Sequence, residues 1–307
     1  MNNAEYGQNT ISLLSIVIPA HNEEGCICST VEHLHVELRI HNIRHEIVVV
    51  DDGSTDNTWE LLVALQRRIP EVVPIKNISP YGFGRAVIKG LDNMNGDAVV
   101  IMMADESDDC RDVVLYWREL NEGFDCIFGS RFMKGGGTID YPKVKYVINR
   151  LANPFLRFMF RTGYYDTTNA FKAYRKEVID GCRPLISPHF NLTVELPLKA
   201  IVRGFTWKVV PITWRNRRTG LANLKISEMG SRYLFICLYV WLEKYLSWGD
   251  YKKASLSTFS PVVENQLNTD RPMPSPRISR DREIRSNPVV SNEQPEIHRQ
   301  TRKGFAG

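Results

Sequence analysis

The chain has 307 residues, of which 43% are hydrophobic and 24% are charged, a composition typical of a soluble globular protein with one α/β domain and appendages. Its net charge of +4 at pH 7 gives no reason to expect a nucleic-acid partner, although it suits an anionic membrane surface. The six cysteines are scattered without a Cys-x-x-Cys pair, which indicates a reducing compartment and argues against a disulfide framework or a zinc site.

The N-terminal half alternates between two kinds of hydrophobic pattern. The polar start of the chain lacks the basic-then-apolar layout of a secretory signal, so we expect a protein that is not secreted. Strand-like runs occupy residues 15–18, 46–50, 98–102 and 126–128, and helical stretches occupy 25–39, 58–68, 84–93 and 111–122. Thr55 or Asp56 is expected to cap the second helix. This alternation predicts right-handed βαβ units and a mostly parallel sheet.

Two amphipathic helices are expected in the second half. Residues 141–161 are rich in basic and aromatic side chains and predict a helix that breaks near Pro154; it either packs on the core with a wet face or binds a membrane surface. A strand is expected at 207–214 and a second amphipathic helix at 226–248. The longest apolar run, 233–242, is too short for the roughly 20 residues of a membrane-spanning helix. After Tyr251 the composition predicts a disordered tail.

Polar and acidic motifs follow three of the predicted strands. The first is Pro-Ala-His-Asn-Glu at 19–23, the second Asp-Asp-Gly-Ser at 51–54, and the third the acidic cluster at 105–109. Open α/β sheets bind ligands at the carboxyl ends of their strands, and adjacent carboxylates resist burial unless something binds them. We interpret the set as a nucleotide site in which carboxylates hold Mg²⁺ or Mn²⁺ against a diphosphate. Alone, the third cluster could equally be a helix start capped by Ser107 or Asp108.

The motifs PAHNEE, DDGSTD, DESDD and Gly-Ser-Arg at 129–131 resemble those of the inverting family 2 glycosyltransferases. The sequences at 166–171 and 217–220 narrow the resemblance to the dolichol- or polyprenyl-phosphate sugar synthases of the mannosyltransferase type. The resemblance implies a GT-A nucleotide-diphospho-sugar transferase fold with a mostly parallel, Rossmann-like sheet. The expected organisation is a flexible N-terminus at 1–11, the GT-A domain at 12–225, an amphipathic interfacial helix at 226–250 and the disordered tail at 251–307.

The same resemblance implies which residues bind the nucleotide-sugar donor. These are Pro19, Ala20, Asn22, Glu23, Asp51, Asp52, Gly53, Ser54, Arg85 and Asp105. Asp52 would reach the base or the ribose. The family's Asp-x-Asp metal motif reads Met103-Ala104-Asp105 here, so one ligand of the Mg²⁺ or Mn²⁺ ion is missing unless Asp108, Asp109 or the diphosphate replaces it. We expect Asp105 and Asp108 to be the metal ligands.

A phosphate acceptor needs no catalytic base. The second pKa of a polyprenyl monophosphate is about 6, so at neutral pH it is mostly a dianion and a competent nucleophile. We expect Arg131, Lys145 and Arg217 to orient this phosphate for in-line attack with inversion, which makes Asp105, Arg131 and Arg217 the catalytic set. A frequent Ser-Lys pair of the family reads Ala222-Asn223, which removes one phosphate contact.

The sequence therefore predicts an enzyme that moves a sugar, mannose or glucose, from a GDP- or UDP-sugar to polyprenyl or dolichyl phosphate. Such an acceptor places the enzyme peripherally on the cytoplasmic face of a membrane. Two alternatives remain open. The acceptor could be a hydroxyl group of a glycan, lipid or protein, with Asp166 as the general base, or the chain could bind nucleotide-sugars without turnover, as the loss of an aspartate at Met103 suggests.

Overall fold

The computed structural model describes residues 10–216 and 226–252, with the side chains of 226–229 left aside. All of these residues belong to one of two compact units of the chain, Met1–Pro261; the other, Val262–Gly307, lies outside the described residues. Residues 1–9 of the predicted flexible N-terminus at 1–11, and residues 253–307 of the predicted disordered tail at 251–307, lie outside them as well. Within the described part, no helix combines the length and the hydropathy that crossing a membrane requires.

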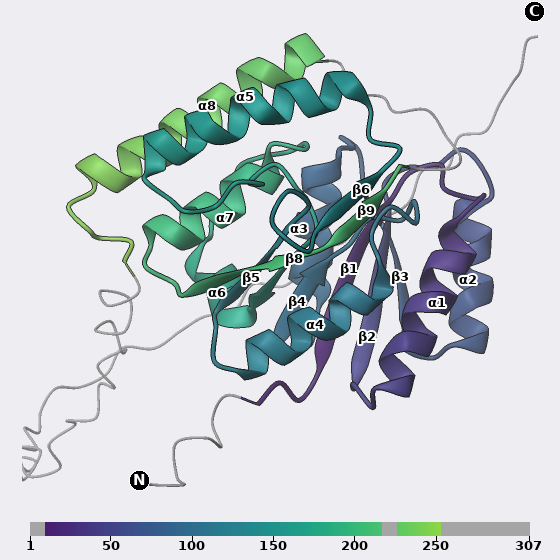
Figure 1. Ribbon diagram of the computed structural model, residues 1–307. Coiled ribbons are helices and arrows are strands. Elements are labelled where there is room, and N and C mark those ends of the chain that lie inside the picture. Colours follow the sequence, from purple (N-terminus) through teal and green to yellow (C-terminus); the bar gives the residue numbers. More distant parts are fainter. Residues whose placement is uncertain (1–9, 217–225, 253–307) are drawn as a thin grey trace, which may run out of the picture. The chain divides into compact units, whose positions relative to one another are not determined.

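A seven-stranded sheet forms the centre of the unit (Figure 1). Its order is β3 (Val72–Lys76), β2 (His45–Asp51), β1 (Leu14–Ala20), β4 (Ala98–Ile101), β7 (Lys172–Arg175), β5 (Cys126–Ser130) and β8 (Trp207–Pro211). All neighbours pair in parallel except β7, which runs antiparallel to both β4 and β5. The predicted mostly parallel sheet is thus confirmed, and the carboxyl ends of β1, β2 and β4 meet at one edge.

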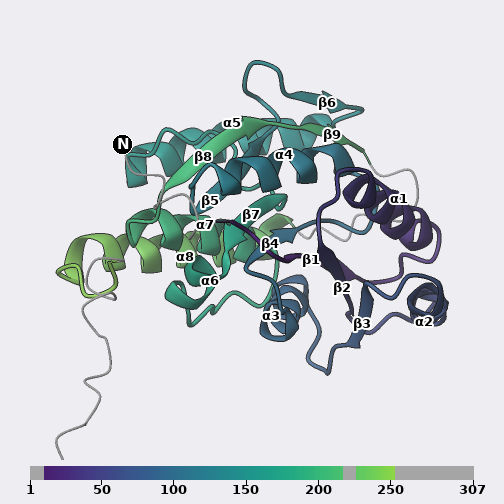
Figure 2. The same ribbon diagram turned by 90° about the horizontal axis from the view of Figure 1, so that it is seen from below.

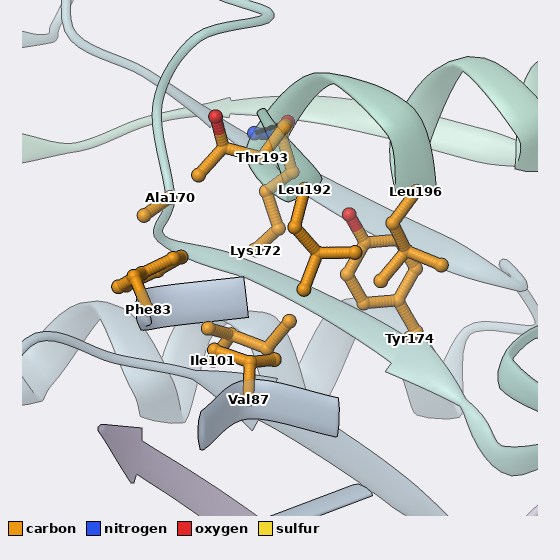
Figure 3. A pocket seen from close by; sticks show the side chains of 9 residues that line it. All are labelled: Phe83, Val87, Ile101, Ala170, Lys172, Tyr174, Leu192, Thr193 and Leu196. Carbon is orange, nitrogen blue, oxygen red and sulfur yellow. Dashed lines mark hydrogen bonds between the residues drawn. The ribbon is translucent and has the colours of Figure 1, made fainter. Parts of the chain in front are cut away.

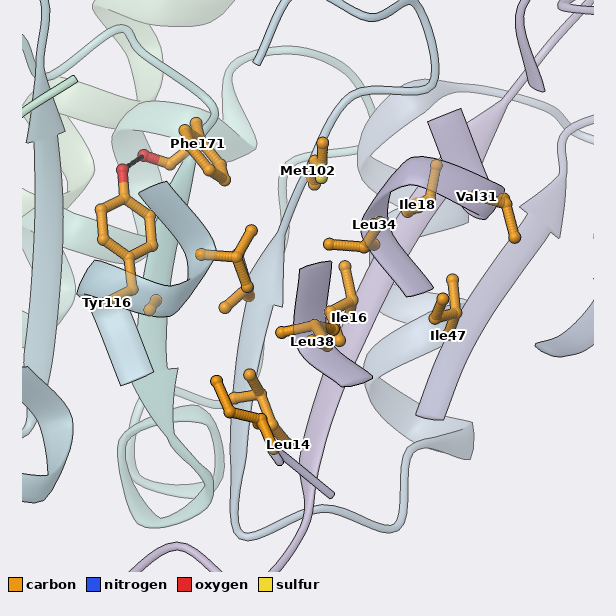
Figure 4. Packing of buried hydrophobic residues seen from close by; sticks show 14 of the residues in the cluster. Leu14, Ile16, Ile18, Val31, Leu34, Leu38, Ile47, Met102, Tyr116 and Phe171 are labelled. Atoms are coloured by element: carbon orange, nitrogen blue, oxygen red, sulfur yellow. Dashed lines mark hydrogen bonds between the residues drawn. The ribbon is translucent and has the colours of Figure 1, made fainter. Parts of the chain in front are cut away.

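Helices cover both faces of this sheet (Figure 2). One face carries α1 (Ile27–Ile40), α2 (Thr58–Arg68) and α4 (Cys110–Asn121), and the other carries α3 (Phe83–Asn93), α6 (Lys176–Gly181) and α7 (Leu192–Val202). Strand β1 is buried along its whole length, because Leu14, Ile16 and Ile18 pack against α1 (Figure 4) whereas Val17 faces α3. Gly90 lets α3 approach closely, since a Cβ atom there would lie 2.4 Å from Val17 Cγ1.

Two long helices and a small sheet complete the unit. Helix α5 (Lys143–Phe160) and helix α8 (Ile226–Leu246) lie side by side next to α7 (Figure 1), and they bury a shared cluster that includes Leu156, Leu198 and Val240. Strands β6 (Gly137–Ile139) and β9 (Thr213–Arg215) pair in parallel. A buried ion pair, Arg203 Nε to Glu243 Oε1 at 2.7 Å, ties the end of α7 to α8.

Several details differ from the sequence-based predictions. Helix α5 continues through Pro154, which is exposed, so the carbonyl group left without a helical donor can be hydrated. The N-cap residue of α2 is Asn57; Asp56 instead accepts hydrogen bonds from the backbone N–H and the hydroxyl of Thr58, at 3.0 and 2.6 Å. The strand expected at 207–214 is divided between β8 and β9.

Candidate functional site

The polar motifs after β1 and β2 are hydrogen-bonded to each other. Strand pairing sets Ala20 opposite Asp51, so the turns that follow both strands begin side by side. The backbone N–H of Asn22 donates to Ser54 Oγ at 3.0 Å, and Thr55 N–H donates to Asn22 Oδ1 at 2.8 Å. Pro19 and Ala20 are buried at the end of the strand. The structure therefore brings the first two predicted groups of donor-binding residues together.

The two aspartates of the second motif organise the surrounding loops. Asp51 Oδ1 accepts from Ser54 N–H at 3.1 Å. Asp52 is buried; its Oδ1 accepts from Asn77 Nδ2 and its Oδ2 from the backbone N–H of Gly82, both at 2.8 Å. A carboxylate has about four acceptor positions, so Asp52 can still bind a ligand. Its first role in the fold is to fix the turn that begins α3.

Tyr81 and Arg85 lie at that turn. A Cβ atom on Gly53, which has a φ of +75°, would be 2.6 to 2.8 Å from three atoms of the Tyr81 ring, so the ring packs directly on this glycine. Arg85 Nη1 donates to the carbonyl oxygen of Tyr81 at 3.1 Å, which places Arg85 beside the second motif as the sequence predicts. Glu23 contributes its backbone N–H, which donates to Thr58 Oγ1 at 2.9 Å at the start of α2.

The third motif forms a tight acidic turn after β4. Asp105 Oδ1 accepts from Ser107 N–H at 3.2 Å, and Asp108 Oδ2 accepts from Met103 N–H at 3.0 Å. Both carboxyl groups are buried. Burial raises the pKa of Asp108 to about 7, and the neighbouring charge of Asp105 acts in the same direction. Helix α4 is capped by Asp109, which accepts from Arg111 N–H at 3.0 Å, so the caps expected at Ser107 or Asp108 were wrong.

The acidic turn could hold a divalent cation only with help from a ligand. Across residues 10–216 and 226–252, no group of three or more histidine, cysteine, aspartate or glutamate side chains is placed to bind a metal. Mg²⁺, however, is usually bound by one or two carboxylates together with substrate phosphates and water. Asp105 and Asp108 supply the hard oxygen atoms that Mg²⁺ and Mn²⁺ prefer, so their chemistry fits such an ion.

A buried ion pair joins the end of β5 to the segment that precedes β7. Arg131 donates from its backbone N–H and from Nε to Asp166 Oδ2, both at 2.9 Å, and from Nη2 to Oδ1 at 2.6 Å. Arg131 is 8% exposed and Asp166 is fully buried. Although burial lowers the pKa of Arg131, the hydrogen bonds and charge of Asp166 raise it above the ordinary value. Both oxygens of Asp166 are thus engaged by one arginine.

Lys172 is a buried residue that sequence reasoning did not single out. Its Nζ donates to the carbonyl oxygens of Thr167, at 3.0 Å, and Thr193, at 3.2 Å, and also to that of Asn169. Its side chain lines a narrow cavity of about 10 Å³ together with Phe83 and other apolar side chains (Figure 3), room for about one water molecule. Lys172 therefore fixes the turn that carries Asp166. A lysine between Phe171 and Ala173 was the available signal.

The ionisation of Lys172 predicts a pH-dependent stability. Burial lowers its pKa to about 7, whereas an unfolded lysine titrates near pH 10.4. Between these values the unfolded chain binds a proton that the folded chain does not, so the free energy of unfolding rises with pH. Compared with Lys172→Met, the wild-type free energy of unfolding should increase by about 2 kcal/mol between pH 7 and pH 9. Urea denaturation at both pH values measures this difference, with exposed Lys143→Met as control; a constant difference would contradict the prediction.

The other cationic residues that the sequence predicts at the site are Lys145 and Arg217. Arg131 is 5.4 Å from the centre of the Tyr141 ring, just before α5, and half-buried Lys145 lies in the first turn of that helix. Arg217 lies outside the described residues, as do Ala222 and Asn223. Arg150 of α5 was not predicted; its guanidinium is 5.4 Å from the ring of Phe132, the residue after Arg131. It adds positive charge beside Arg131.

The outer faces of α5 and α8 carry many exposed apolar side chains. On α5, Phe158 is 85% exposed and Leu151 is 71% exposed. On α8, exposed leucines recur every four residues along one face, at Leu234, Leu238, Leu242 and Leu246. Contiguous exposed apolar surface of this kind marks sites of interaction with proteins or membranes.

Comparisons with known proteins agree with this architecture. Residues 15–182 match the family described as Glycosyl transferase family 2. Polyprenol monophosphomannose synthase of Mycolicibacterium smegmatis is 30% identical over 221 residues, which are 70% of this chain and 82% of that protein. Dolichol-phosphate mannosyltransferase of Pyrococcus furiosus is 31% identical over 224 residues, 69% of this chain but 59% of that longer protein.

A solved structure shows the same fold. Glucosyl-3-phosphoglycerate synthase from Mycobacterium tuberculosis, in complex with Mn²⁺, uridine diphosphate and phosphoglyceric acid, superposes with a TM-score of 0.57 at 20% identity. The match covers 76% of this chain and 78% of that one. The same enzyme in complex with Mn²⁺ and UDP-glucose gives a TM-score of 0.58. These likenesses confirm the predicted fold.

Proposed function

The chain belongs to glycosyl transferase family 2, and from this premise we propose that it transfers mannose or glucose from a GDP- or UDP-sugar to a polyprenyl or dolichyl phosphate, with inversion. The two curated relatives, named for mannose and a polyprenol or dolichol phosphate, support this acceptor. The structural relative that holds uridine diphosphate supports a nucleotide-sugar donor.

The donor would bind at the edge where β1, β2 and β4 end. Asn22, Asp52 and Ser54 lie together there, and the acidic turn that carries Asp105 and Asp108 follows β4 at the same edge. These two carboxylates would hold Mg²⁺ or Mn²⁺ together with the diphosphate of the donor. When bound, the ion supplies positive charge that offsets the charge of the departing nucleoside diphosphate.

The burial and hydrogen bonds of Asp166 support a phosphate acceptor over a hydroxyl acceptor. A hydroxyl acceptor needs a general base, and Asp166 is the residue that the sequence offers for this role. In the structure Asp166 is fully buried and both of its oxygens accept hydrogen bonds from Arg131. A fully buried carboxylate whose two oxygens both bind an arginine is not accessible to an acceptor hydroxyl. A phosphate dianion needs no base, so the site supports a polyprenyl phosphate better than an alcohol.

The cations at the other end of the site suit a phosphate. Asp166 stabilises the positive charge of Arg131. Lys145 and Arg150 of α5 supply further positive charge. We assign Arg131 and Lys145, with Arg217, to orienting the acceptor phosphate toward the anomeric carbon of the donor. The exposed apolar faces of α5 and α8, beside basic residues such as Arg157, suit shallow insertion into a membrane surface where an isoprenoid acceptor resides.

A transfer assay tests the proposal. The purified protein is incubated with Mn²⁺ or Mg²⁺, a polyprenyl phosphate and each of several labelled GDP- and UDP-sugars, and the label in the organic phase is counted. We expect label with one donor, its loss with a chelator, and no label when the matching polyprenol replaces its phosphate. Equal transfer to the polyprenol would favour the hydroxyl-acceptor alternative. Nucleotide binding without transfer to any acceptor would favour a binding protein.

A further inference from the structure

A second cavity lies beside the proposed donor site. It has a volume of about 510 Å³ and opens between the start of α3, the segment that precedes α7, and the N-terminal half of α8. We propose that this cavity binds the headgroup of an anionic bilayer phospholipid that carries alcohol hydroxyl groups, as phosphatidylglycerol does. The lipid is neither donor nor acceptor, so the site goes beyond the proposed function and shares with it only the membrane surface.

Positive charge gathers around this cavity. Arg85 of α3 and Arg232 of α8 line it from two helices, and His189 lines it from the segment that precedes α7. The N-terminus of α7, which carries the partial positive charge of a helix start, also reaches the cavity at Asn191. No carboxylate is among the lining residues in the part of the chain that the structure describes. The ligand is therefore expected to be an anion, and basic pockets at a membrane surface bind lipid headgroups.

Two buried polar side chains of the wall require more from the ligand than negative charge. Ser187 is 1% and Asn191 5% exposed, yet within the described residues neither Ser187 Oγ nor Asn191 Oδ1 has a hydrogen-bond partner. Asn191 stands at the N-cap of α7, but its side chain makes no capping hydrogen bond. An unsatisfied buried polar group costs free energy and calls for a bound partner. Because Asn191 Oδ1 is an acceptor, its partner must donate a hydrogen bond.

These groups together select a phosphodiester with alcohol groups. The phosphate oxygens of phosphatidylglycerol can accept hydrogen bonds from the guanidinium of Arg232 and the hydroxyl of Ser187, and its glycerol hydroxyls can donate to Asn191 Oδ1. The headgroup of phosphatidic acid supplies negative charge without an alcohol group. That of phosphatidylcholine supplies neither a net charge nor an alcohol group. The cavity should therefore discriminate among phospholipids by their headgroups.

The open side of the cavity is apolar and leads to the surface of α8. Ile186 is 42% and Phe235 is 64% exposed, and both line the cavity. Three and seven residues after Phe235, on the same face of α8, Leu238 and Leu242 are also exposed. A volume of about 510 Å³ exceeds what a phosphate alone needs and accommodates a glycerophosphate headgroup. A lipid with its headgroup in the cavity would thus place its acyl chains along this face of α8.

The wall that carries the buried polar groups is held rigidly. Glu195 of α7 accepts hydrogen bonds from the backbone N–H groups of Ile186, at 2.9 Å, and Ser187, at 2.8 Å, and pairs with buried Lys199 at 2.7 Å. Gly84 approaches the same segment so closely that a Cβ atom there would lie 2.1 Å from the carbonyl oxygen of Ser187. The wall is therefore in place before a ligand binds, which lowers the entropic cost of binding.

Water-soluble short-chain lipids test the site without a bilayer. Dihexanoyl phosphatidylglycerol is titrated into the full chain by calorimetry below its micelle concentration, with no donor or acceptor present. The dihexanoyl forms of phosphatidic acid and phosphatidylcholine are the comparison ligands, and we expect phosphatidylglycerol to bind at least about tenfold more tightly than either. Arg232→Gln and Ser187→Ala should each weaken its binding by about tenfold, because each removes a hydrogen bond to the charged phosphate.

Two controls separate the site from folding and from general charge effects. Arg118→Gln removes an exposed arginine of α4, on the opposite face of the sheet from α3 and α7, and should bind phosphatidylglycerol normally. Ser187→Ala should not lower the melting temperature, because its hydroxyl oxygen has no partner among the described residues. A loss of lipid affinity at unchanged stability therefore reports on the ligand contact itself.

Other results would overturn the assignment. Equal binding of phosphatidic acid would remove the role of the alcohol groups, and wild-type affinity in Arg232→Gln and Ser187→Ala would place the lipid elsewhere. Displacement of phosphatidylglycerol by UDP or GDP would assign the cavity to the donor, and displacement by geranyl monophosphate would assign it to the acceptor. If phosphatidylglycerol binds as expected but no donor yields transfer, the proposed function fails and the site stands. If transfer occurs without selective binding of phosphatidylglycerol, only the site fails.

Discussion

Asp105→Asn should lower the rate of sugar transfer by about a thousandfold, because the substitution removes a charged ligand of the proposed cation. A catalytic divalent ion contributes several kcal/mol to the stabilisation of the departing charge, and each 1.36 kcal/mol is worth about tenfold in rate. Asparagine keeps an oxygen that can accept the hydrogen bond from Ser107 N–H, so the acidic turn should survive. The measurement is kcat at saturating Mn²⁺ together with Mn²⁺ affinity in the presence of the nucleoside diphosphate.

The matched control for this variant is Asp180→Asn. Asp180 is 53% exposed and pairs with Lys176 on the surface of α6, far along the chain from the acidic turn. It should leave both kcat and Mn²⁺ affinity unchanged. If Asp105→Asn keeps wild-type turnover and Mn²⁺ affinity, Asp105 does not hold the cation, and the assignment of the metal site is wrong.

Arg131→Met should destabilise the folded chain by about 3–5 kcal/mol, because it leaves Asp166 buried without its partner. For a domain of this size the melting temperature should fall by about 6–20 °C. Asp166→Asn should have a similar effect, since it leaves the guanidinium of Arg131 buried without a counter-charge. Thermal unfolding followed by circular dichroism measures both.

The double variant Arg131→Met/Asp166→Asn separates structure from catalysis. Removing both charges should restore much of the lost stability, because no buried charge is left unpaired. Transfer should nevertheless stay at least about a hundredfold below wild type if Arg131 orients the acceptor phosphate. A stable double variant with normal turnover would reduce Arg131 to a structural residue.

The sequence predicted the first part of the fold well because its signals there are local. Helix α2 begins and ends where expected, and β1 and β2 extend the predicted strands by no more than two residues at either end. Strand β7 and helix α7 were missed. Both contain a buried lysine, Lys172 in β7 and Lys199 in α7. Lys172 donates to the carbonyl oxygen of Thr193, 21 residues away, and Lys199 pairs with Glu195, one helical turn away. Because these lysines are buried, neither segment shows a regular hydrophobic pattern.

The candidate site was predictable only in part for a related reason. The contact between Asn22 and Ser54 follows from the rule that parallel strands end at one edge. No comparable rule pairs Arg131 with Asp166, 35 residues away, or directs Asp52 to Gly82. Those contacts depend on how the chain closes in three dimensions. The role of Asp166 changed from a possible base to the partner of an arginine once that closure was visible.

The reversed direction of β7 has a consequence for how the enzyme could diversify. Because β7 runs against its neighbours, its first residue, Lys172, pairs with Ile101 near the end of β4 and with Phe128 of β5. The residues before Lys172 therefore reach the edge of the sheet that also carries Asp105, after β4, and Arg131, after β5. A strand of four residues thus fixes the spacing between the proposed donor and acceptor parts of the site. We therefore expect the loops on either side of this strand to tolerate exchange without altering that spacing, as long as the register of the strand is kept.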